Sequence, residues 1–290
     1  MSTAENLDNK IKEFWPRNGP ASQEIEKYVK KYSKEKIVIK CGGRILLDPD
    51  LFNNFINDVT ILQKLGLTPI VVHGGGPRIK NKLDKLNIET KFIMGLRVTD
   101  EKVIKIVEDV MLEFNKEIVN ALEKKACKAK SVTIKENNAI YAEQKNKELG
   151  YVGKPTRIDV QLIKNLIKES FIPVIMPMGL DEKKQAYNIN ADTAAGALAT
   201  SLKSRRLMLM TDVEGVYNKS KKLISEIKAV EAEKLIYDET ISDGMIPKIR
   251  TCINAVNNGV RGVVVIDGRK PHSILFELFS DKGSGTLIRK

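Results

Sequence analysis

Short runs of β-branched and aliphatic residues alternate along this chain with longer segments of helical periodicity. Residues 37–39, 69–72, 172–175 and 262–266 are the four clearest runs, and residues 207–210 are a fifth. Such runs are typical of strands buried on both faces of a parallel sheet. The clearest helical pattern spans residues 100–125, behind a Thr99-Asp100 cap. The alternation predicts an α/β fold in which helices cover both faces of a mainly parallel sheet.

Two parts of the chain depart from this alternation. Residues 139–157 carry turn formers and short alternating segments, which favour hairpins over another helical crossover. Before Lys36, a break at residues 16–20 precedes an amphipathic helix. Its apolar face needs a partner surface, either on its own domain or on another subunit. That face is formed by Ile25, Tyr28, Val29 and Tyr32.

The net charge is +12, from 49 lysine and arginine residues against 37 aspartate and glutamate residues. Such a charge favours anionic ligands and permits nonspecific association with nucleic acid or anionic membranes. The lysines are scattered among acids, however, and no basic stripe with interleaved aromatic residues occurs. We therefore expect a solvated lysine-rich surface and no nucleic-acid partner.

The three cysteines, Cys41, Cys127 and Cys252, form no close-spaced pair. Their spacing disfavours a disulfide scaffold or a zinc ribbon, and we expect no metal held by the chain's own ligands. The first residues lack the pattern of a secretion signal, and no apolar run approaches the ~20 residues that span a bilayer. The expectation is a cytoplasmic protein without a membrane partner.

Two glycine-rich loops follow predicted strands. Lys40-Cys41-Gly42-Gly43 comes directly after the first strand, and His73-Gly74-Gly75-Gly76-Pro77 closes the second. Glycines there let backbone N–H groups approach an anion closely, and a lysine adds positive charge. The first loop alone is more typical of a tight turn, but two such loops at neighbouring strand ends predict a phosphate or carboxylate cradle.

His73 has the chemistry of a general base, but a histidine beside a glycine turn is more often a structural hydrogen-bonding residue. No serine, cysteine or carboxylate is spaced to form a triad with it. We expect a structural role for His73.

Charged and amide side chains mark the next two segments. Arg97 stands just before a helix capped by Asp100, where its planar fork suits a carboxylate, although a surface salt bridge is the simpler interpretation. If residues 188–192 are extended, Asn188, Asn190 and Asp192 point to one side. Helix capping explains only one of these three residues.

The last two segments lie in the carboxyl-terminal part of the chain. Residues 211–217 run off a predicted strand into a turn, a place where open α/β sheets bind nucleotides. The run Gly244-Met245-Ile246-Pro247-Lys248 places Lys248 in the first turn of a helix. A cation there opposes the helix dipole, so Lys248 needs an anion nearby.

Six ordered segments together resemble the amino-acid kinase family and, within it, the N-acetylglutamate kinases. They are the lysine before paired glycines, the HGGGP loop, and the segments GLRVTD, NINADTAAG, TDVEGVY and GMIPK, and the resemblance runs from about Glu24 to the last residue. It implies a three-layer αβα sandwich around a mainly parallel eight-stranded sheet. It also implies transfer of phosphate from ATP, with Mg²⁺, to the γ-carboxylate of N-acetyl-L-glutamate, the second step of arginine biosynthesis.

The resemblance divides the chain into three parts. Residues 1–34 form an amino-terminal extension with an oligomerisation helix, residues 35–187 form the lobe for the acyl amino acid and for dimerisation, and residues 188–290 form the ATP-binding lobe. A homo-oligomer with a dimer core is implied, and a hexamer is the larger assembly.

The resemblance also assigns roles to residues at matching positions. Lys40 and Lys248 match two lysines that flank the migrating phosphoryl group, and Asp192 matches the carboxylate that orients both. No catalytic base is needed, because a γ-carboxylate is already ionised at neutral pH. In the substrate site, Gly43, Gly74 and Gly75 match backbone donors, Arg97 with Asn188 matches the substrate clamp, and Asn190 is a further matching residue. Those that match the nucleotide site are Thr211, Asp212, Gly215, Val216, Tyr217, Gly244 and Met245.

The sequence departs from the family pattern at three positions. Asp243 stands where glycine is usual, Cys41 replaces a common tyrosine or leucine, and Arg44 follows the glycine pair. An acid beside a triphosphate is unfavourable unless magnesium or lysine is close, so Asp243 puts nucleotide affinity in doubt.

Feedback inhibition is a further implication of the resemblance. Family members that arginine inhibits carry an extra amino-terminal helix that links dimers into a ring-shaped hexamer, and arginine binds between that helix and the carboxyl-terminal region. The matching residues here are Tyr32, His272, Glu277 and Gly283. Glu277 suits a guanidinium because a carboxylate accepts two parallel hydrogen bonds from it. The simpler interpretation is a core helix with a solvated glutamate.

Two alternatives remain. One is a kinase of the same fold for aspartate, glutamate, uridylate, carbamate or carrier-bound aminoadipate; the chain ends soon after residues 285–288, which disfavours the longer kinases and an acetyltransferase of this fold. The other is a catalytically silent sensor of arginine or acetylglutamate. The presence of both Lys40 and Lys248 argues against the sensor, because a binding module does not need lysines on both sides of a phosphoryl path.

Overall fold

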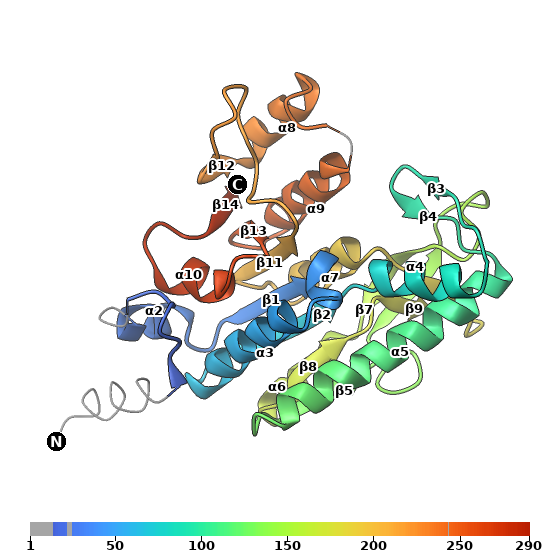
Figure 1. Cartoon of the computed structure of the whole chain (residues 1–290), viewed down its shortest axis with the longest axis horizontal. Coiled ribbons are helices and arrows are strands. Elements are labelled where there is room, and N and C mark those ends of the chain that lie inside the picture. The colour runs from blue at the N-terminus through green and yellow to red at the C-terminus, as the bar shows by residue number, and fades with distance from the viewer. Residues whose placement is uncertain (1–13, 22–24, 243) are drawn as a thin grey trace.

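A large, mainly parallel sheet forms the centre of the molecule (Figure 1). The computed structural model describes residues 14–21, 25–242 and 244–290. The eight strands lie in the order β12-β14-β13-β11-β1-β2-β8-β5, and the β13–β14 pair is antiparallel whereas the pairs from β13 to β5 are parallel. Their bounds are β1 (Lys36–Cys41), β2 (Thr68–His73), β5 (Ala129–Val132), β8 (Ile172–Ile175), β11 (Arg206–Thr211), β12 (Glu226–Lys228), β13 (Val263–Asp267) and β14 (Gly285–Arg289). The predicted eight-stranded α/β sandwich is confirmed.

Side-chain alternation along the strands divides the core into two layers. In β1, Ile37 and Ile39 pack into one cluster of buried residues, and Val38 packs into the other. The Ile37 layer is covered by α2 (Ile25–Tyr32), α3 (Pro49–Lys64), α5 (Glu101–Glu123) and α10 (Ser273–Phe279). The Val38 layer is covered by α6 (Val160–Lys168), α7 (Ala191–Ser201), α8 (Ala229–Tyr237) and α9 (Met245–Asn257). Whether a β1 residue has an odd or an even number therefore decides to which face of the sheet its side chain points and which set of helices it contacts.

Smaller elements extend the structure beside the main sheet. The hairpins predicted for residues 139–157 are confirmed by the antiparallel pair β6 (Ile140–Gln144) and β7 (Gly153–Ile158). They join β9 (Met178–Leu180) and β10 (Ala186–Asn188) in a four-stranded sheet. A ribbon of β3 (Phe92–Ile93) and β4 (Leu96–Arg97) stands near the end of α4 (Gly76–Lys85) (Figure 1).

The apolar face of α2 packs against its own chain, which is the first of the two predicted alternatives. Ile25 and Tyr32 are each 1% exposed, and the Tyr28 hydroxyl donates to Asp281 at 2.6 Å. Trp15 meets Phe279 of α10 in an edge-to-face contact with ring centroids 5.5 Å apart. The described part of the chain contains no helix long and apolar enough to cross a bilayer.

Candidate active site

The site forms where the carboxyl ends of β1, β2 and β11 meet at one edge of the sheet. Cys41 and His73 are register partners at the ends of β1 and β2. One residue further on, the N–H of Gly74 donates to the carbonyl of Cys41 at 2.7 Å. That bond ties the two predicted glycine loops together, as expected for neighbouring strand ends. It also occupies the Gly74 N–H, so Gly74 lines the pocket without offering the backbone donor predicted for it.

Three charged residues meet at this edge. Lys40 shares its parity in β1 with Val38 and therefore faces α7 and α9. Its Nζ lies 3.0 Å from Oδ1 of Asp192, in the first turn of α7, while Oδ2 of Asp192 accepts a hydrogen bond from Nζ of Lys248 in α9. Asp192 is the anion that Lys248 was expected to need.

The environment of Asp192 keeps it ionised. Its side chain is only 13% exposed, and those of Lys40 and Lys248 are 11% exposed. Burial would raise the pKa of Asp192, but the two ammonium groups outweigh it and hold that pKa well below its usual range. Stability linked to this carboxylate is therefore fully present above the pKa of an unfolded aspartate and is lost only at strongly acidic pH. At neutral pH the cluster carries two positive charges and one negative charge.

Glycine is required in the loop that follows Lys40. A Cβ on Gly42 would push Nζ of Lys40 away from its present position. Gly43 has a φ of 64° and a Cβ there would lie 2.5 Å from Oδ1 of Asp212, which accepts the N–H of Arg44 at 3.1 Å. Because Gly42 and Gly43 have no side chains, Lys40 and the carboxylate of Asp212 fit beside the loop. Gly42 was not among the predicted site residues, although the paired glycines were its signal.

A pocket of about 500 Å³ opens beside Lys40. All six residues predicted for the substrate site line it, namely Gly43, Gly74, Gly75, Arg97, Asn188 and Asn190. Asn190 caps α7 by accepting the N–H groups of Asp192 and Thr193 at 3.0 and 3.1 Å. Among Asn188, Asn190 and Asp192, helix capping therefore explains the side chain of Asn190.

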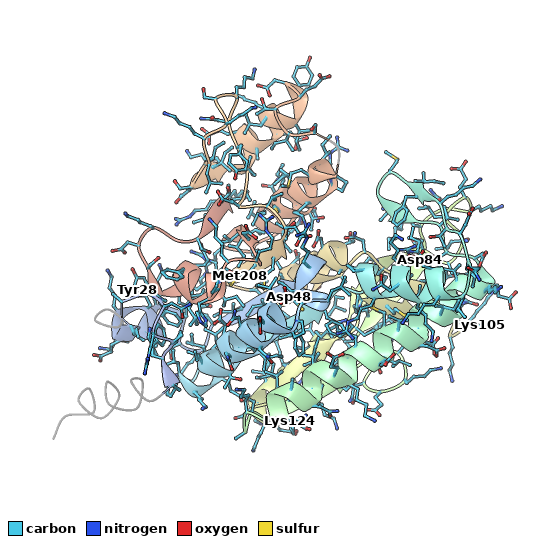
Figure 2. The ribbon with its side chains drawn as sticks, viewed as in Figure 1. Tyr28, Asp48, Asp84, Lys105, Lys124 and Met208 are labelled. Atoms are coloured by element: carbon cyan, nitrogen blue, oxygen red, sulfur yellow. The ribbon has the colours of Figure 1, made fainter. Side chains whose placement is uncertain are left out.

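Arg97 is held at the pocket wall by its own hairpin. Its guanidinium donates to the hydroxyl of Thr90 and lies 4.7 Å from the ring centre of Phe92, which also lines the pocket. Asp84, labelled in Figure 2, lies on α4 below this hairpin, and its carboxylate partly offsets the lowering of the Arg97 pKa by burial. Sequence reasoning missed Thr90 and Phe92, because neither belongs to a motif.

The residues predicted for the nucleotide lie at the end of β11 and at the start of α9. Thr211 is the last residue of β11, Gly244 is the N-cap residue of α9, and Met245 is the first residue of that helix. Val216 is different, because its side chain is buried in the core and its N–H donates to Thr286 Oγ1 at 2.8 Å. It therefore shapes the turn from the interior. Asp243 lies outside the described residues.

Beside this turn, charged side chains form two sets of ion pairs. Lys270 pairs with Glu214 at 2.6 Å, and Glu214 accepts the hydroxyl of Tyr217 at 3.0 Å. Asp267, at the end of β13, binds Arg269 through both carboxylate oxygens. The residues that follow β13 were not among the predicted site residues, although a glycine and two basic residues directly after a strand are a pattern typical of anion-binding loops. Within the described residues, no group of three or more His, Cys, Asp or Glu side chains could hold a metal ion.

Three of the four residues predicted for arginine lie together, in a pocket separate from the one that Lys40 lines. Tyr32, Glu277 and Gly283 line a pocket of about 430 Å³ between α2, α10 and β14. Glu277 accepts the N–H of Ser284 at 3.0 Å, and burial raises its pKa. His272 does not line this pocket: its Nδ1 lies 2.6 Å from Oδ1 of Asp58 in α3, and both side chains are buried.

Sequence comparison decides the family. A profile described as the amino acid kinase family matches residues 35–267. The chain belongs to the amino acid kinase family. Acetylglutamate kinase of Pelagibacter ubique (strain HTCC1062) is 58% identical over 275 residues, which are 95% of this chain and 96% of the relative. That of Brucella canis (strain ATCC 23365 / NCTC 10854 / RM-666) is 44% identical over 275 residues, 90% of this chain and 93% of the relative. The resemblance drawn from the six motifs is confirmed.

Solved structures agree on the amino acid kinase fold. N-acetylglutamate synthase of Neisseria gonorrhoeae, complexed with coenzyme A and N-acetyl-glutamate, superposes with a TM-score of 0.84 at 23% identity, and the match covers 92% of this chain and 62% of the synthase. Carbamate kinase from Giardia lamblia bound to AMP-PNP gives a TM-score of 0.67 at 19% identity, over 88% of this chain and 98% of the kinase. At these identities the likeness concerns the fold alone.

Proposed function

We propose that this chain transfers the γ-phosphoryl group of ATP to the side-chain carboxylate of N-acetyl-L-glutamate, giving N-acetylglutamyl 5-phosphate and ADP in arginine biosynthesis. The observation that carries the proposal is the Lys40–Asp192–Lys248 cluster, whose Lys40 lines a pocket together with Arg97 and Asn188. The 58% identity to an acetylglutamate kinase over 95% of the chain supports this choice within the family.

The reaction asks for positioning and charge neutralisation more than for covalent chemistry. A carboxylate oxygen of the acceptor forms a bond to the γ-phosphorus, and the bond from that phosphorus to the bridging oxygen of ADP breaks. The acceptor is already ionised, so no residue has to remove a proton. Lys40 and Lys248 neutralise charge on the transferring group from two sides. Asp192 fixes the distance between them.

The acyl amino acid occupies the 500 Å³ pocket in this proposal. Arg97 binds its α-carboxylate through the planar fork, and the amide of Asn188 binds its acetamido group. Gly43 and Gly75 offer backbone N–H groups toward the reacting carboxylate. Asn190 contributes through the orientation of α7, since its side chain is used by the cap.

ATP takes the other side of the lysine cluster. The residues that would hold it are Thr211, Asp212, Gly215, Tyr217, Gly244 and Met245, with Val216 supporting the turn from the interior. Mg²⁺, which neutralises phosphate charge, is usually held by substrate phosphates and few carboxylates. Both oxygens of Asp192 already face lysines, so its carboxylate serves the lysines rather than the metal.

An acceptor panel tests this proposal. We expect kcat/KM for N-acetyl-L-glutamate to exceed the values for glutamate, aspartate and uridylate by about 100-fold or more. A site built for an amide rejects the charged ammonium group of the two amino acids, and uridylate has no carboxylate for Arg97. ADP release in a coupled assay gives the measurement. Faster turnover with free glutamate, aspartate or uridylate would favour another kinase activity of the same fold.

We also propose that arginine inhibits the enzyme from the pocket of Tyr32, Glu277 and Gly283. Glu277 is the guanidinium partner, and Lys31 and Arg206 in the same pocket suit the arginine carboxylate. Arginine inhibits only if it binds an open arrangement better than a closed one, since equal affinity shifts nothing. The predicted homo-oligomer stays a prediction, and light scattering of the full-length protein gives its mass.

Replacing Glu277 with glutamine should raise the arginine concentration for half-inhibition by at least about 10-fold, because the charge-assisted fork is lost while the shape is kept. Turnover without arginine should change by less than about 2-fold. Glu233→Gln, an exposed change on α8, is the control for the lost charge. Unchanged arginine sensitivity of the Glu277 variant would rule out this pocket.

A further inference from the structure

We propose that His73 and Asn115 are positioning residues that fix the Gly74–Gly75 peptide so that the N–H of Gly75 faces the substrate pocket. The inference rests on the proposed function, since it assigns that N–H to the acceptor carboxylate. His73 is the last residue of β2 and Asn115 lies in α5, and both are fully buried. Neither side chain lines the pocket, so any effect on the reaction acts through the backbone.

A continuous polar chain connects these residues. His73 Nδ1 lies 2.9 Å from the carbonyl oxygen of Gly74, and His73 Nε2 lies 3.2 Å from Nδ2 of Asn115. Nδ2 of Asn115 also donates to the carbonyl of Val174 at 2.9 Å, and its Oδ1 accepts the hydroxyl of Ser131 at 2.6 Å. The chain thus runs from the glycine loop, through α5, to β8 and β5.

The partners determine which imidazole nitrogen carries the proton. The carbonyl of Val174 can only accept, so the Asn115 atom facing it is the amide nitrogen. The second hydrogen on that nitrogen points to Nε2 of His73, which must accept it. Nδ1 therefore carries the hydrogen and donates to Gly74. Burial lowers the pKa of His73 to about 4, which keeps the ring neutral near pH 7.

Fixing the Gly74 carbonyl also fixes the next N–H. In a trans peptide the C=O and the following N–H point in opposite directions. The Gly74 carbonyl points at the buried imidazole, so the N–H of Gly75 points away from it, toward the pocket that Gly74, Gly75 and Gly76 line. Three consecutive glycines allow this peptide to rotate with little steric cost, and the donor in His73 selects one orientation.

Two substitutions of His73 separate positioning from packing. Asparagine places its amide nitrogen near the position of Nδ1 and keeps a donor for Gly74, whereas glutamine places its amide near Nε2 and keeps only the contact with Asn115. We expect His73→Gln to lower kcat/KM for N-acetyl-L-glutamate by about 10- to 100-fold. The KM for ATP should change by less than about 2-fold. His73→Asn should recover most of the loss.

Provided that the wild-type enzyme is active, an equal loss of kcat/KM in both variants, or no loss in either, would overturn the positioning role. If the wild-type chain shows no turnover with any acceptor, the proposed function has failed and NMR still decides the positioning claim. The chain has only two histidines, His73 and His272, so ¹⁵N imidazole shifts are readily assigned. We expect a hydrogen on Nδ1 and a bare Nε2 for His73 between pH 6 and 8; the opposite tautomer would overturn the proposal.

Discussion

Replacing Lys248 with alanine is expected to lower kcat by about 100-fold or more, the usual effect of removing one preorganised charge from a transition state. Lys248 is 11% exposed and bonded to Asp192, so its ammonium group is held before the substrates bind. Asp192 keeps Lys40 as a partner in this variant, which limits the loss of stability. Steady-state kinetics with saturating ATP and N-acetyl-L-glutamate gives the measurement.

Arg250→Ala is the matched control for this change. Arg250 is exposed and lies two residues after Lys248 in the same helix. Its replacement removes one positive charge, as the Lys248 change does, but leaves the Lys40–Asp192–Lys248 cluster intact. We expect kcat of the control to stay within about 2-fold of wild type. Near-normal turnover of the Lys248 variant would show that this lysine does not stabilise the transferring group.

The second large effect is expected at Arg97. Its replacement by alanine should weaken binding of N-acetyl-L-glutamate by roughly 2–4 kcal/mol, because a bidentate carboxylate contact in a desolvated pocket is lost. The KM for N-acetyl-L-glutamate should rise accordingly, and the KM for ATP should change little. Lys91→Ala, an exposed change in the same hairpin region, serves as the control. If the Arg97 variant instead binds ATP weakly and spares the acyl amino acid, the two lobes have been assigned in the wrong order.

Strands β1, β2, β8, β11 and β13 could be predicted from local sequence because they are short buried runs separated by helices. Strands β5, β12 and β14 carry no comparable run, and the strand order could not be predicted because β14 enters between β12 and β13 from the far end of the chain. The destination of α2 was also undecided, because an apolar face specifies that it must be covered but not by what. Tyr28 and Tyr32 are covered by their own chain.

The candidate site was predicted in its residue types more than in its contacts. Glycine loops and Lys248 carry local signals, and the parity of Lys40 in β1 follows from the strand itself. The ion pairs of Asp192 depend on α7 and α9 meeting, which is a tertiary event. For the same reason, the hydrogen bond from the Gly74 N–H to Cys41 could not be predicted from the sequence.

Trapping of the phosphorylated product shows whether the chain transfers phosphate to a carboxylate. The purified chain is incubated with ATP, Mg²⁺ and N-acetyl-L-glutamate in the presence of hydroxylamine, which converts an acyl phosphate into a hydroxamate. We expect one hydroxamate for each ADP released, and neither product above background without the acyl amino acid. ADP release without hydroxamate, or no ADP release at all, would contradict phosphoryl transfer to a carboxylate, and the second result would favour a binding-only sensor.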